Sequence, residues 1–332
     1  MSQMNGTHLI LEGVVRLLSP LSHIGESTGT ESFLNTVNII GPDGEPAEVF
    51  VYSGNAFRGA LRDLAAEYML GRLGVEKMGL ELFYMLFSGG AIGGEQSVDI
   101  DQARRFRALI PMFSLWGGGV GNQIMGGKMH VGAMYPICAE CTNILPERLR
   151  IAETSWRQLI TEQSYTRTDD AKNERLRERF VQQLPDQDRL MLEGETAEKP
   201  DKPDRKPQQM RYTQELVAPG AQFYQRIDFK HVTDVELGSF VSALSEFSKH
   251  PYLGGQNRIG HGLCEISYTW REAGQPGEGA HFLTVGPDGM LSGAKAKDSL
   301  EAYNEYLARI YEEYLAMNQT TLQKMLEAGV SS

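Results

Sequence analysis

The segment from Ser53 to Arg62 has the residue types and the spacing to bind a phosphate group. Ser53 and Asn55 are types that cap the start of a helix, and an apolar stripe at helical spacing follows them. Arg58 and Arg62 are four residues apart, so they are neighbours at the side of that stripe near the helix N-terminus, and we expect both to lie off the packed side of the helix. Free N–H groups at a helix end and guanidinium groups are typical phosphate ligands. A capped helix with solvated arginines has the same pattern, so both interpretations stay open.

A second candidate is the glycine-rich segment from Gly254 to Gly262, which also carries Gln256, Asn257 and Arg258. The backbone at glycine residues can approach a ligand closely, and amide and guanidinium groups can form hydrogen bonds with the ligand. The segment lacks the terminal Gly-Lys-Ser/Thr of a phosphate-binding Walker loop. A flexible connection between two strands would have the same composition.

Metal-ligating residue types form two short motifs. Cys138 and Cys141 make a CxxC pair, and His261 and Cys264 make an HxxC pair, which together could supply three sulfurs and one nitrogen to zinc. Cys264 falls on the inward face of an expected strand, which favours buried free cysteines instead. The sequence contains no HExxH motif and no Gly-x-Ser-x-Gly motif. We therefore expect no metal, no cofactor and no catalytic residue.

The composition limits the class of protein. The 332 residues are 41% hydrophobic and 23% charged, as in a soluble globular protein, and the formal net charge is −11. An acidic chain is a poor nonspecific coat for nucleic acid, so any such ligand must bind in a local basic groove. The three cysteines, and the lack of a leader or a long apolar run, favour a cytoplasmic protein with no membrane partner.

Hydrophobic periodicity predicts the elements that position these groups. The expected strands are 7–18, 128–136, 221–229 and one beginning at Cys264. The expected helices are 56–70, 235–248 and 298–315. Turn residues at 41–44 predict a hairpin, and the mixed charge of 161–211 predicts a solvated excursion. This order favours an α+β fold with an antiparallel sheet of the ferredoxin-like or RNA-recognition-motif type.

Five segments, in this order, resemble the RAMP superfamily of CRISPR proteins. They are Leu21-Ser-His-Ile-Gly25, Ser53 to Arg62, Leu115-Trp-Gly-Gly with Lys128-Met-His-Val-Gly132, Glu215 to Phe229, and Gly254 to Gly262. The resemblance covers most of the chain. Within the superfamily the chain looks most like the backbone subunit related to the seventh Cas family, in its type IV form.

The resemblance implies a palm of the RNA-recognition-motif type with helical fingers and a protruding thumb. Residues 1–70 and 215–332 would form the palm, 71–160 the glycine-rich fingers with a returning palm strand, and 161–214 the thumb. Copies of such a subunit stack as a helical filament along one CRISPR guide RNA, and each thumb displaces a base. The implied partners are this guide RNA, a complementary target nucleic acid, further copies of the chain and other subunits of a class 1 antiviral effector complex.

We expect ten side chains to contact RNA on these grounds. They are His23, Ser53, Asn55, Arg58, Arg62, Lys128, Arg167, Gln256, Asn257 and Arg258.

One departure from the superfamily bears on catalysis. Relatives in type III complexes cut RNA with an aspartate after the first strand, whereas the matching region here reads Ser32-Phe-Leu-Asn-Thr-Val-Asn38. Neutral oxygens cannot hold a hard cation or take a proton as a carboxylate does. Glu26, Glu31 and Asp43 are nearby, however. We expect a non-catalytic scaffold. The alternatives are an RNA endonuclease of the same superfamily, target-cutting or guide-processing, and an unrelated enzyme with a glycine-lined pocket.

Overall fold

The computed structural model describes residues 6–90, 104, 107–120, 123–167 and 210–315. The chain divides into two units, and each is built from separate stretches of sequence. The first unit comprises Met1–His23, Leu34–Thr161 and Leu216–Ser332, and the second comprises Ile24–Phe33 and Glu162–Glu215. The sequence analysis assigned 161–214 to the thumb and did not join residues 24–33 to it.

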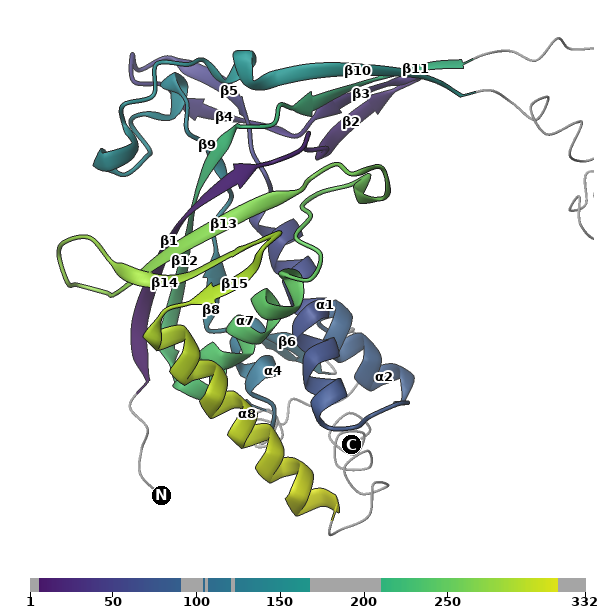
Figure 1. Ribbon diagram of the computed structural model, residues 1–332, viewed down its shortest axis with the longest axis vertical. Helices are drawn as coiled ribbons and strands as arrows, with labels where there is room; N and C mark the ends of the chain where they lie inside the picture. Colours follow the sequence, from purple (N-terminus) through teal and green to yellow (C-terminus); the bar gives the residue numbers. More distant parts are fainter. Residues whose placement is uncertain (1–5, 91–103, 105–106, 121–122, 168–209, 316–332) are drawn as a thin grey trace, which may run out of the picture. The chain divides into compact units, whose positions relative to one another are not determined.

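A largely antiparallel sheet of seven described strands is the centre of the first unit (Figure 1). Its strands are β1 (Thr7–Leu17), β8 (Met129–Val131), β9 (Tyr135–Pro136), β12 (Gln222–Val232), β13 (Cys264–Glu272), β14 (Ala280–Gly286) and β15 (Gly289–Ser292). Their order is β15-β14-β13-β1-β12-β8, and β9 also pairs with β12. β1 is therefore a central strand, paired antiparallel with β12 on one side and with β13 on the other.

The alternation of side chains along β1 gives the sheet one apolar and one polar face. Leu9 and Leu11 point to the apolar face and are at most 2% exposed. Arg16 points to the opposite face, where it forms an ion pair with Glu265 on the neighbouring strand at 3.2 Å. Removing the apolar face from water contributes about 25 cal/mol per Å² of buried apolar surface, so helices must cover it.

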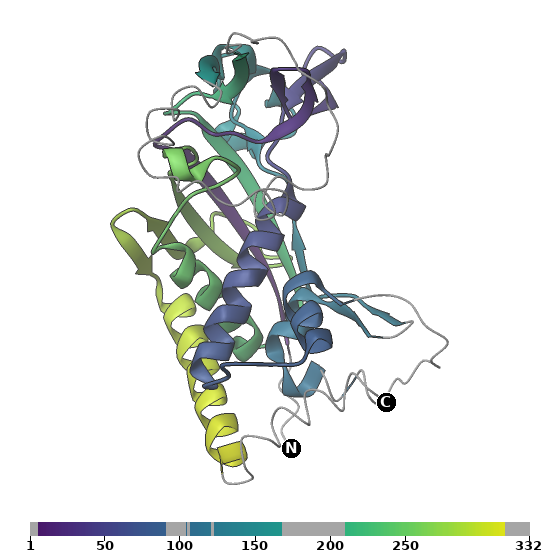
Figure 2. The ribbon, with the colours of Figure 1, turned by 90° about the vertical axis from the view of Figure 1, so that its right-hand side faces the viewer.

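Three helices cover the apolar face of this sheet (Figure 2). They are α1 (Gly54–Arg72), α7 (Asp234–Phe247) and α8 (Ala294–Leu315). Thr233 and Glu236 form a capping box that fixes the start of α7. Helices α7 and α8 pack closely at Gly238, because a Cβ atom there would overlap the carbonyl oxygen of Ser299.

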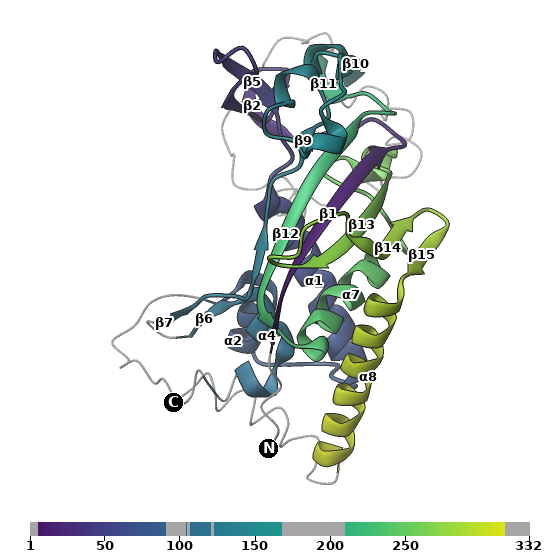
Figure 3. The same ribbon diagram turned by 90° about the vertical axis from the view of Figure 1, so that its left-hand side faces the viewer.

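Shorter elements complete the first unit (Figure 3). The strands outside the large sheet are β4 (Thr36–Ile40), β5 (Pro46–Phe50), β6 (Gly118–Val120) and β7 (Gln123–Met125). The short helices are α2 (Leu80–Phe83), the π-helix Tyr84–Ser88, α4 (Pro111–Trp116) and the 3-10 turns Ala139–Cys141, Glu147–Leu149, Trp156–Leu159 and Asn257–Ile259. β4 and β5 form a hairpin around Gly44, whose φ of 84° favours glycine, as the turn residues predicted.

The second unit is built around a sheet of four described strands in the order β10-β11-β3-β2. The strands are β2 (Ile24–Thr28), β3 (Glu31–Leu34), β10 (Ile160–Arg167) and β11 (Met210–Val217). β11 runs parallel to β3, with Thr213 opposite Glu31. Tyr165 and Tyr212 stack with their ring centroids 5.5 Å apart. Residues 168–209 of the predicted excursion lie outside the described residues.

The predicted α+β class with antiparallel sheets is confirmed, and each of the seven predicted strands and helices has a counterpart. The strand predicted at 128–136 is two short strands, β8 and β9, which both pair with β12. The hairpin of β14 and β15 was not predicted. None of the described helices is long and apolar enough to cross a membrane.

Candidate nucleic-acid interface

Three stretches of the first unit meet beside the N-terminus of α1. They are residues 20–23, which follow β1, residues 52–58 at the start of α1, and residues 253–262. The N–H group of Ser53 donates to Nε2 of His23 at 3.2 Å. The N–H group of Gly254 donates to the hydroxyl oxygen of Tyr52 at 3.1 Å, and a further backbone bond joins Gly255 to Ser22 at 2.9 Å. The structure thus gathers the residues that the sequence analysis took from three separate motifs.

His23 is an uncharged acceptor in this arrangement. Its Nε2 atom accepts from the Ser53 N–H, so the neutral ring carries its proton on Nδ1. Burial lowers the pKa of His23 below the ordinary imidazole value. The ring also lies against Tyr52, with centroids 4.5 Å apart. His23 therefore positions the start of α1 more than it supplies positive charge.

The start of α1 presents its backbone N–H groups without a side-chain cap. Among the described residues, the Ser53 side chain makes no capping hydrogen bond, contrary to the expectation for that serine. Asn55 is exposed in the first turn, which contains no acidic residue. Gly54 permits the helix to approach β8, since a Cβ atom would lie 2.5 Å from the carbonyl oxygen of Val131. Uncapped N–H groups and the helix dipole favour an anion at this end.

The spacing of Arg62 had suggested a position at the solvated edge of the helix. The structure instead buries this side chain. It is 7% exposed, and its guanidinium donates to the carbonyl oxygens of Leu86 at 2.6 Å and of Met85 and Gly117 at 2.9 Å. Burial, followed by the charge of nearby Arg58, lowers its pKa to about 10, so the group stays charged at neutral pH. These bonds hold residues 85–86 and Gly117, which lie far apart in the sequence, against α1. The expectation that Arg62 lies off the packed side of the helix is wrong.

Arg58 and Lys128 also have partners within the protein. Arg58 is half-buried, and its Nη2 atom donates to the carbonyl oxygen of Trp116. Lys128 donates to both carboxylate oxygens of Glu236, at 2.6 and 2.8 Å, and so ties β8 to the start of α7. The ion pair satisfies a carboxylate whose side chain is only 9% exposed. A phosphate would have to compete with these bonds for either cation.

The glycine-rich segment 253–262 is an ordered turn that packs on its own chain. Gly254 and Gly262 have φ of 73° and 91°, and Cβ atoms there would overlap the carbonyl oxygens of Ser22 and Leu253. Gln256 also adopts the left-handed conformation, with φ of 60°. Gly254 and Gly262 therefore serve close backbone contact within the protein, and not a space left open for a ligand.

The 3-10 turn Asn257–Ile259 is the exposed tip of this segment. Asn257 and Arg258 are exposed, and Ile259 is 65% exposed. His261 is buried at its base, where burial lowers its pKa, and its Nδ1 atom has no hydrogen-bond partner among the described residues. Among the expected cations whose side chains the structure describes, Arg258 is thus the one whose exposed position suits contact with a large ligand.

The sequence analysis also singled out Arg167 and residues 32–38. Arg167 is the last residue of β10 in the second unit, and its side chain lies outside the described residues. In the region 32–38, the amide of Asn35 donates to the carbonyl oxygen of Val51 at 3.1 Å. Thr36 donates to the carboxylate of Glu48 at 2.5 Å. Both side chains are engaged in local bonds.

The two cysteine motifs do not come together. All three cysteines are buried and reduced, and no group of three or more metal-ligating side chains gathers anywhere in the described part of the chain. Cys264 donates to the carbonyl oxygen of Pro251 at 3.5 Å, and burial raises its thiol pKa to about 12. The zinc site that the spacing allowed is therefore not formed by these residues.

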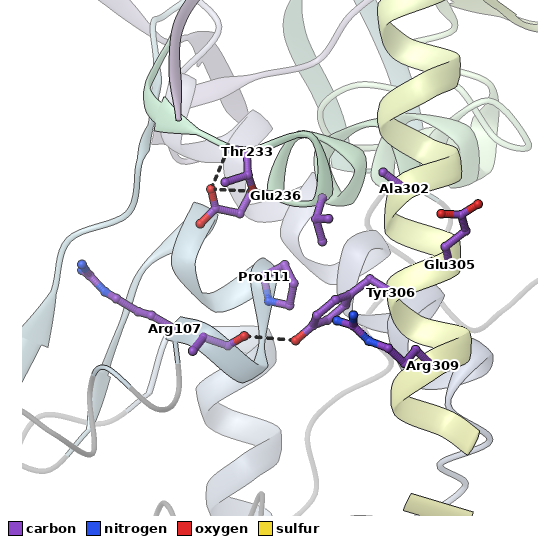
Figure 4. Close-up of a pocket in the computed structure, with 10 residues that line it drawn as sticks. Arg107, Pro111, Thr233, Glu236, Ala302, Glu305, Tyr306 and Arg309 are labelled. Atoms are coloured by element: carbon purple, nitrogen blue, oxygen red, sulfur yellow. Dashed lines mark hydrogen bonds between the residues drawn. The ribbon is translucent and has the colours of Figure 1, made fainter. Parts of the chain in front are cut away.

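A cavity of about 610 Å³ lies elsewhere in the first unit, between α4, the start of α7 and α8 (Figure 4). Its lining includes Arg107, Thr233, Glu236, Glu305, Tyr306 and Arg309. The hydroxyl of Tyr306 donates to the carbonyl oxygens of Ala108 and Leu109 at 3.0 and 2.8 Å. None of the ten expected side chains lines this cavity. The lining contains two cations, Arg107 and Arg309, and two carboxylates, Glu236 and Glu305, so it has no excess of charge that would favour a ligand of one sign.

Tyr52 and Ser22 are interface residues that the sequence analysis missed. Each joins the glycine-rich segment to a stretch more than 200 positions earlier, Tyr52 through its hydroxyl and Ser22 through its carbonyl. No periodicity marks such a contact. The position of Tyr52 immediately before Ser53 was the available signal.

The fold is of the mixed α+β class, with a large antiparallel sheet covered by helices. No family model matches the chain, and no curated protein matches it. Among solved structures, the chain is similar to one chain of a "Type IV-B CRISPR Complex", with a TM-score of 0.54 and 20% sequence identity. The similarity covers 81% of this chain and 92% of that one, and it is a similarity of fold.

Proposed function

We propose that this chain is a non-catalytic backbone subunit of a class 1, type IV-like CRISPR effector complex, which binds guide RNA and presents it for target pairing. The observation that carries the proposal is the similarity in fold to a chain of a Type IV-B CRISPR Complex over most of both chains. The five sequence segments that resemble the RAMP superfamily favour the same class of subunit.

The order of the elements supports a palm of the RNA-recognition-motif or ferredoxin-like type. Along the chain, β1 is followed by α1, by the β8–β9 strands, by β12, by α7 and by β13. This is the βαββαβ order of that fold, with β1 and β12 as central strands. The second unit is the proposed thumb, with strands β2 and β3 included in it.

The distribution of charge supports RNA as the ligand of the interface around α1. The chain has 43 acidic residues, yet residues 20–23, 52–58 and 253–262 contain none. They contribute Arg58, Arg258 and the uncapped N–H groups of α1 instead. Several cations elsewhere in the described residues are paired with carboxylates, as Arg226 is with Asp228 at 2.8 Å. A neutral-to-basic patch on an acidic protein would hold a phosphate backbone while the rest of the surface repels stray nucleic acid.

A backbone role, and not a catalytic one, is proposed because the region after β1 supplies neutral side chains that are already bonded. Asn35 and Thr36 hold Val51 and Glu48, and neither can replace a carboxylate at a hard cation. The proposed partners are guide RNA, a complementary target nucleic acid, further copies of the chain in a filament and other subunits of the complex, in the cytoplasm.

The test is to express the chain with a CRISPR array and extract the nucleic acid that co-purifies with it. We expect RNA of defined length, in complexes that contain several copies of the chain. Arg258→Ala should lower the amount of bound RNA, whereas Arg16→Ala, on the opposite face of the sheet, should not. Protein that carries no RNA, or RNA of random length that is equal in both variants, would overturn the proposal.

A further inference from the structure

Two histidines face each other at one end of the central strand pair. His8, near the start of β1, and His231, near the end of β12, have their Nε2 atoms 3.1 Å apart. Their ring centroids are 4.1 Å apart, and the planes are inclined at 66°. Both side chains are exposed. This pair lies outside the interface around α1 and plays no part in the function proposed above.

An irregularity in the strand pairing creates this arrangement. Thr7 is opposite Val232 and Leu9 is opposite Phe229, so one residue of β1 faces two of β12. Such a β-bulge turns the side chain of the extra residue away from regular alternation. His231 has φ of 49°, a left-handed conformation that is uncommon for residues other than glycine. The bulge directs its ring toward His8.

The backbone around His231 leaves little freedom for a different arrangement. A Cβ atom on Gly6 would overlap the carbonyl oxygen of His231, so only glycine allows this approach. The carbonyl oxygen of His8 accepts from the N–H of Ala273 at 2.9 Å, which fixes the other strand. The two imidazoles are therefore presented by backbone that is held on both sides.

The separation of the two nitrogens suits a shared transition-metal ion. Two bonds of about 2.0–2.1 Å at a tetrahedral angle place their nitrogens about 3.3 Å apart. The observed 3.1 Å requires only a small movement of the rings. If the same contact is a hydrogen bond, one ring donates from its Nε2–H group and the Nε2 atom of the other ring accepts. Only one proton then lies between the two rings.

We propose that His8 and His231 form a two-histidine site for a divalent transition metal such as Zn²⁺ or Cu²⁺. Imidazole nitrogen prefers these ions, whereas Mg²⁺ prefers oxygen ligands. Each ring coordinates through Nε2, and the ring that carried its proton there transfers it through solvent to Nδ1. Water completes the coordination because the pair is exposed. A bound ion crosslinks the start of β1 to the end of β12.

Calorimetric titration of the full chain, purified without a polyhistidine tag, tests the site. We expect saturable binding of one Zn²⁺ per chain and no binding of Mg²⁺ under the same conditions. His8→Gln and His231→Asn should each weaken zinc binding more than about tenfold. Even the loss of a residue that only hydrogen-bonds to a metal ligand lowers metal affinity about 10- to 100-fold. Asparagine is chosen at 231 because it tolerates the left-handed conformation.

His281→Gln is the matched control, since His281 is exposed on β14 and its side chain contacts Thr284 in the same strand. It should leave zinc affinity unchanged. With Cu²⁺, electron paramagnetic resonance should show two coordinated imidazole nitrogens in the parent chain and one in His8→Gln. Zinc binding that is equal in the parent and His8→Gln, or the absence of saturable binding, would overturn the proposal.

Discussion

The Nε atom of Arg62 donates a hydrogen bond to the carbonyl oxygen of Leu86 at 2.6 Å, within a buried part of the first unit. Two further bonds from the same guanidinium reach Met85 and Gly117. Two separate stretches of the chain, residues 85–86 and Gly117, are therefore anchored to one side chain of α1. Arg62 acts as a structural clamp that joins these two stretches to the helix.

Arg62→Ala should lower the free energy of unfolding by about 2–4 kcal/mol, since it leaves three buried carbonyl groups without a charged donor. Chemical denaturation of the parent and variant measures the difference. Arg258→Ala changes an exposed arginine and should stay within about 0.5 kcal/mol of the parent. Equal stability of Arg62→Ala and the parent chain would contradict the clamp.

Arg258→Ala should instead weaken RNA binding and reduce its dependence on salt. Loss of one phosphate contact to a single strand reduces the slope of log K against log salt by about 0.7. Fluorescence anisotropy with a labelled guide RNA at several salt concentrations measures this slope. Arg16→Ala, which removes a cation paired with Glu265, should leave the slope unchanged. An identical slope in all three proteins would remove Arg258 from the interface.

Stability should fall as the pH decreases below 6.5 because of His23 and His261. Burial lowers the pKa of both groups from 6.5 in the folded state. Just below that pH the unfolded chain therefore binds more protons at these positions, which favours unfolding. His23→Gln and His261→Gln should each flatten the curve of unfolding free energy against pH between pH 6.5 and the lowered pKa. His281→Gln is the control, and a loss of slope confined to it would be incompatible with this explanation.

The second unit should be dispensable for folding of the first. The chain leaves and returns to the first unit at bonded positions, since Asn35 donates to the carbonyl of His23 at 2.9 Å and Ala218 to that of Leu159 at 2.7 Å. Short Gly-Ser linkers in place of residues 24–33 and 162–215 should therefore leave a cooperatively folded monomer.

If the second unit is a thumb, the linker protein should bind RNA weakly and form no ordered multi-copy assemblies. Electron microscopy and light scattering of the RNA complexes measure this. Normal assembly of the linker protein would show that the unit is only a surface excursion.

An assembled complex should not cut complementary RNA in the presence of magnesium. Asn35 and Thr36 offer neutral groups that are already hydrogen-bonded, so neither stabilises a cation at the phosphate. Labelled complementary RNA, incubated with the complex, should stay intact on a denaturing gel. Regularly spaced products that disappear in Glu31→Gln would instead identify this subunit as an endonuclease.

Much of the large sheet and its helices could be predicted because period-two and helical patterns are long there. The second unit could not be assembled from sequence, because Glu31 pairs with Thr213 far along the chain and every residue of β2 is exposed. Without one buried face, a strand has no alternation to detect. The β14–β15 hairpin was overlooked although Gly286-Pro-Asp-Gly289 has the same turn residues as the hairpin at 41–44.

The residue types singled out three segments that the structure brings together, but they did not give the partner of each side chain. Arg62 shares its helix face with Ala65, Ala66 and Met69, at spacings of three, four and seven, and all four are buried. That spacing is visible in the sequence, and it indicates that Arg62 faces the core. The ion pair of Lys128 with Glu236 could not be predicted from the sequence, because it depends on how β8 packs against α7.

The central position of β1 has a consequence for synthesis of the protein. The strand is made before its neighbours β12 and β13, which are completed more than 200 residues later. At about 5–20 residues per second, the apolar side chains of β1 stay without these partners on the ribosome for about 10–50 s. Such non-local pairing also slows refolding in vitro. Yields of folded protein should therefore depend on temperature and on chaperones that shield this strand until β13 has emerged.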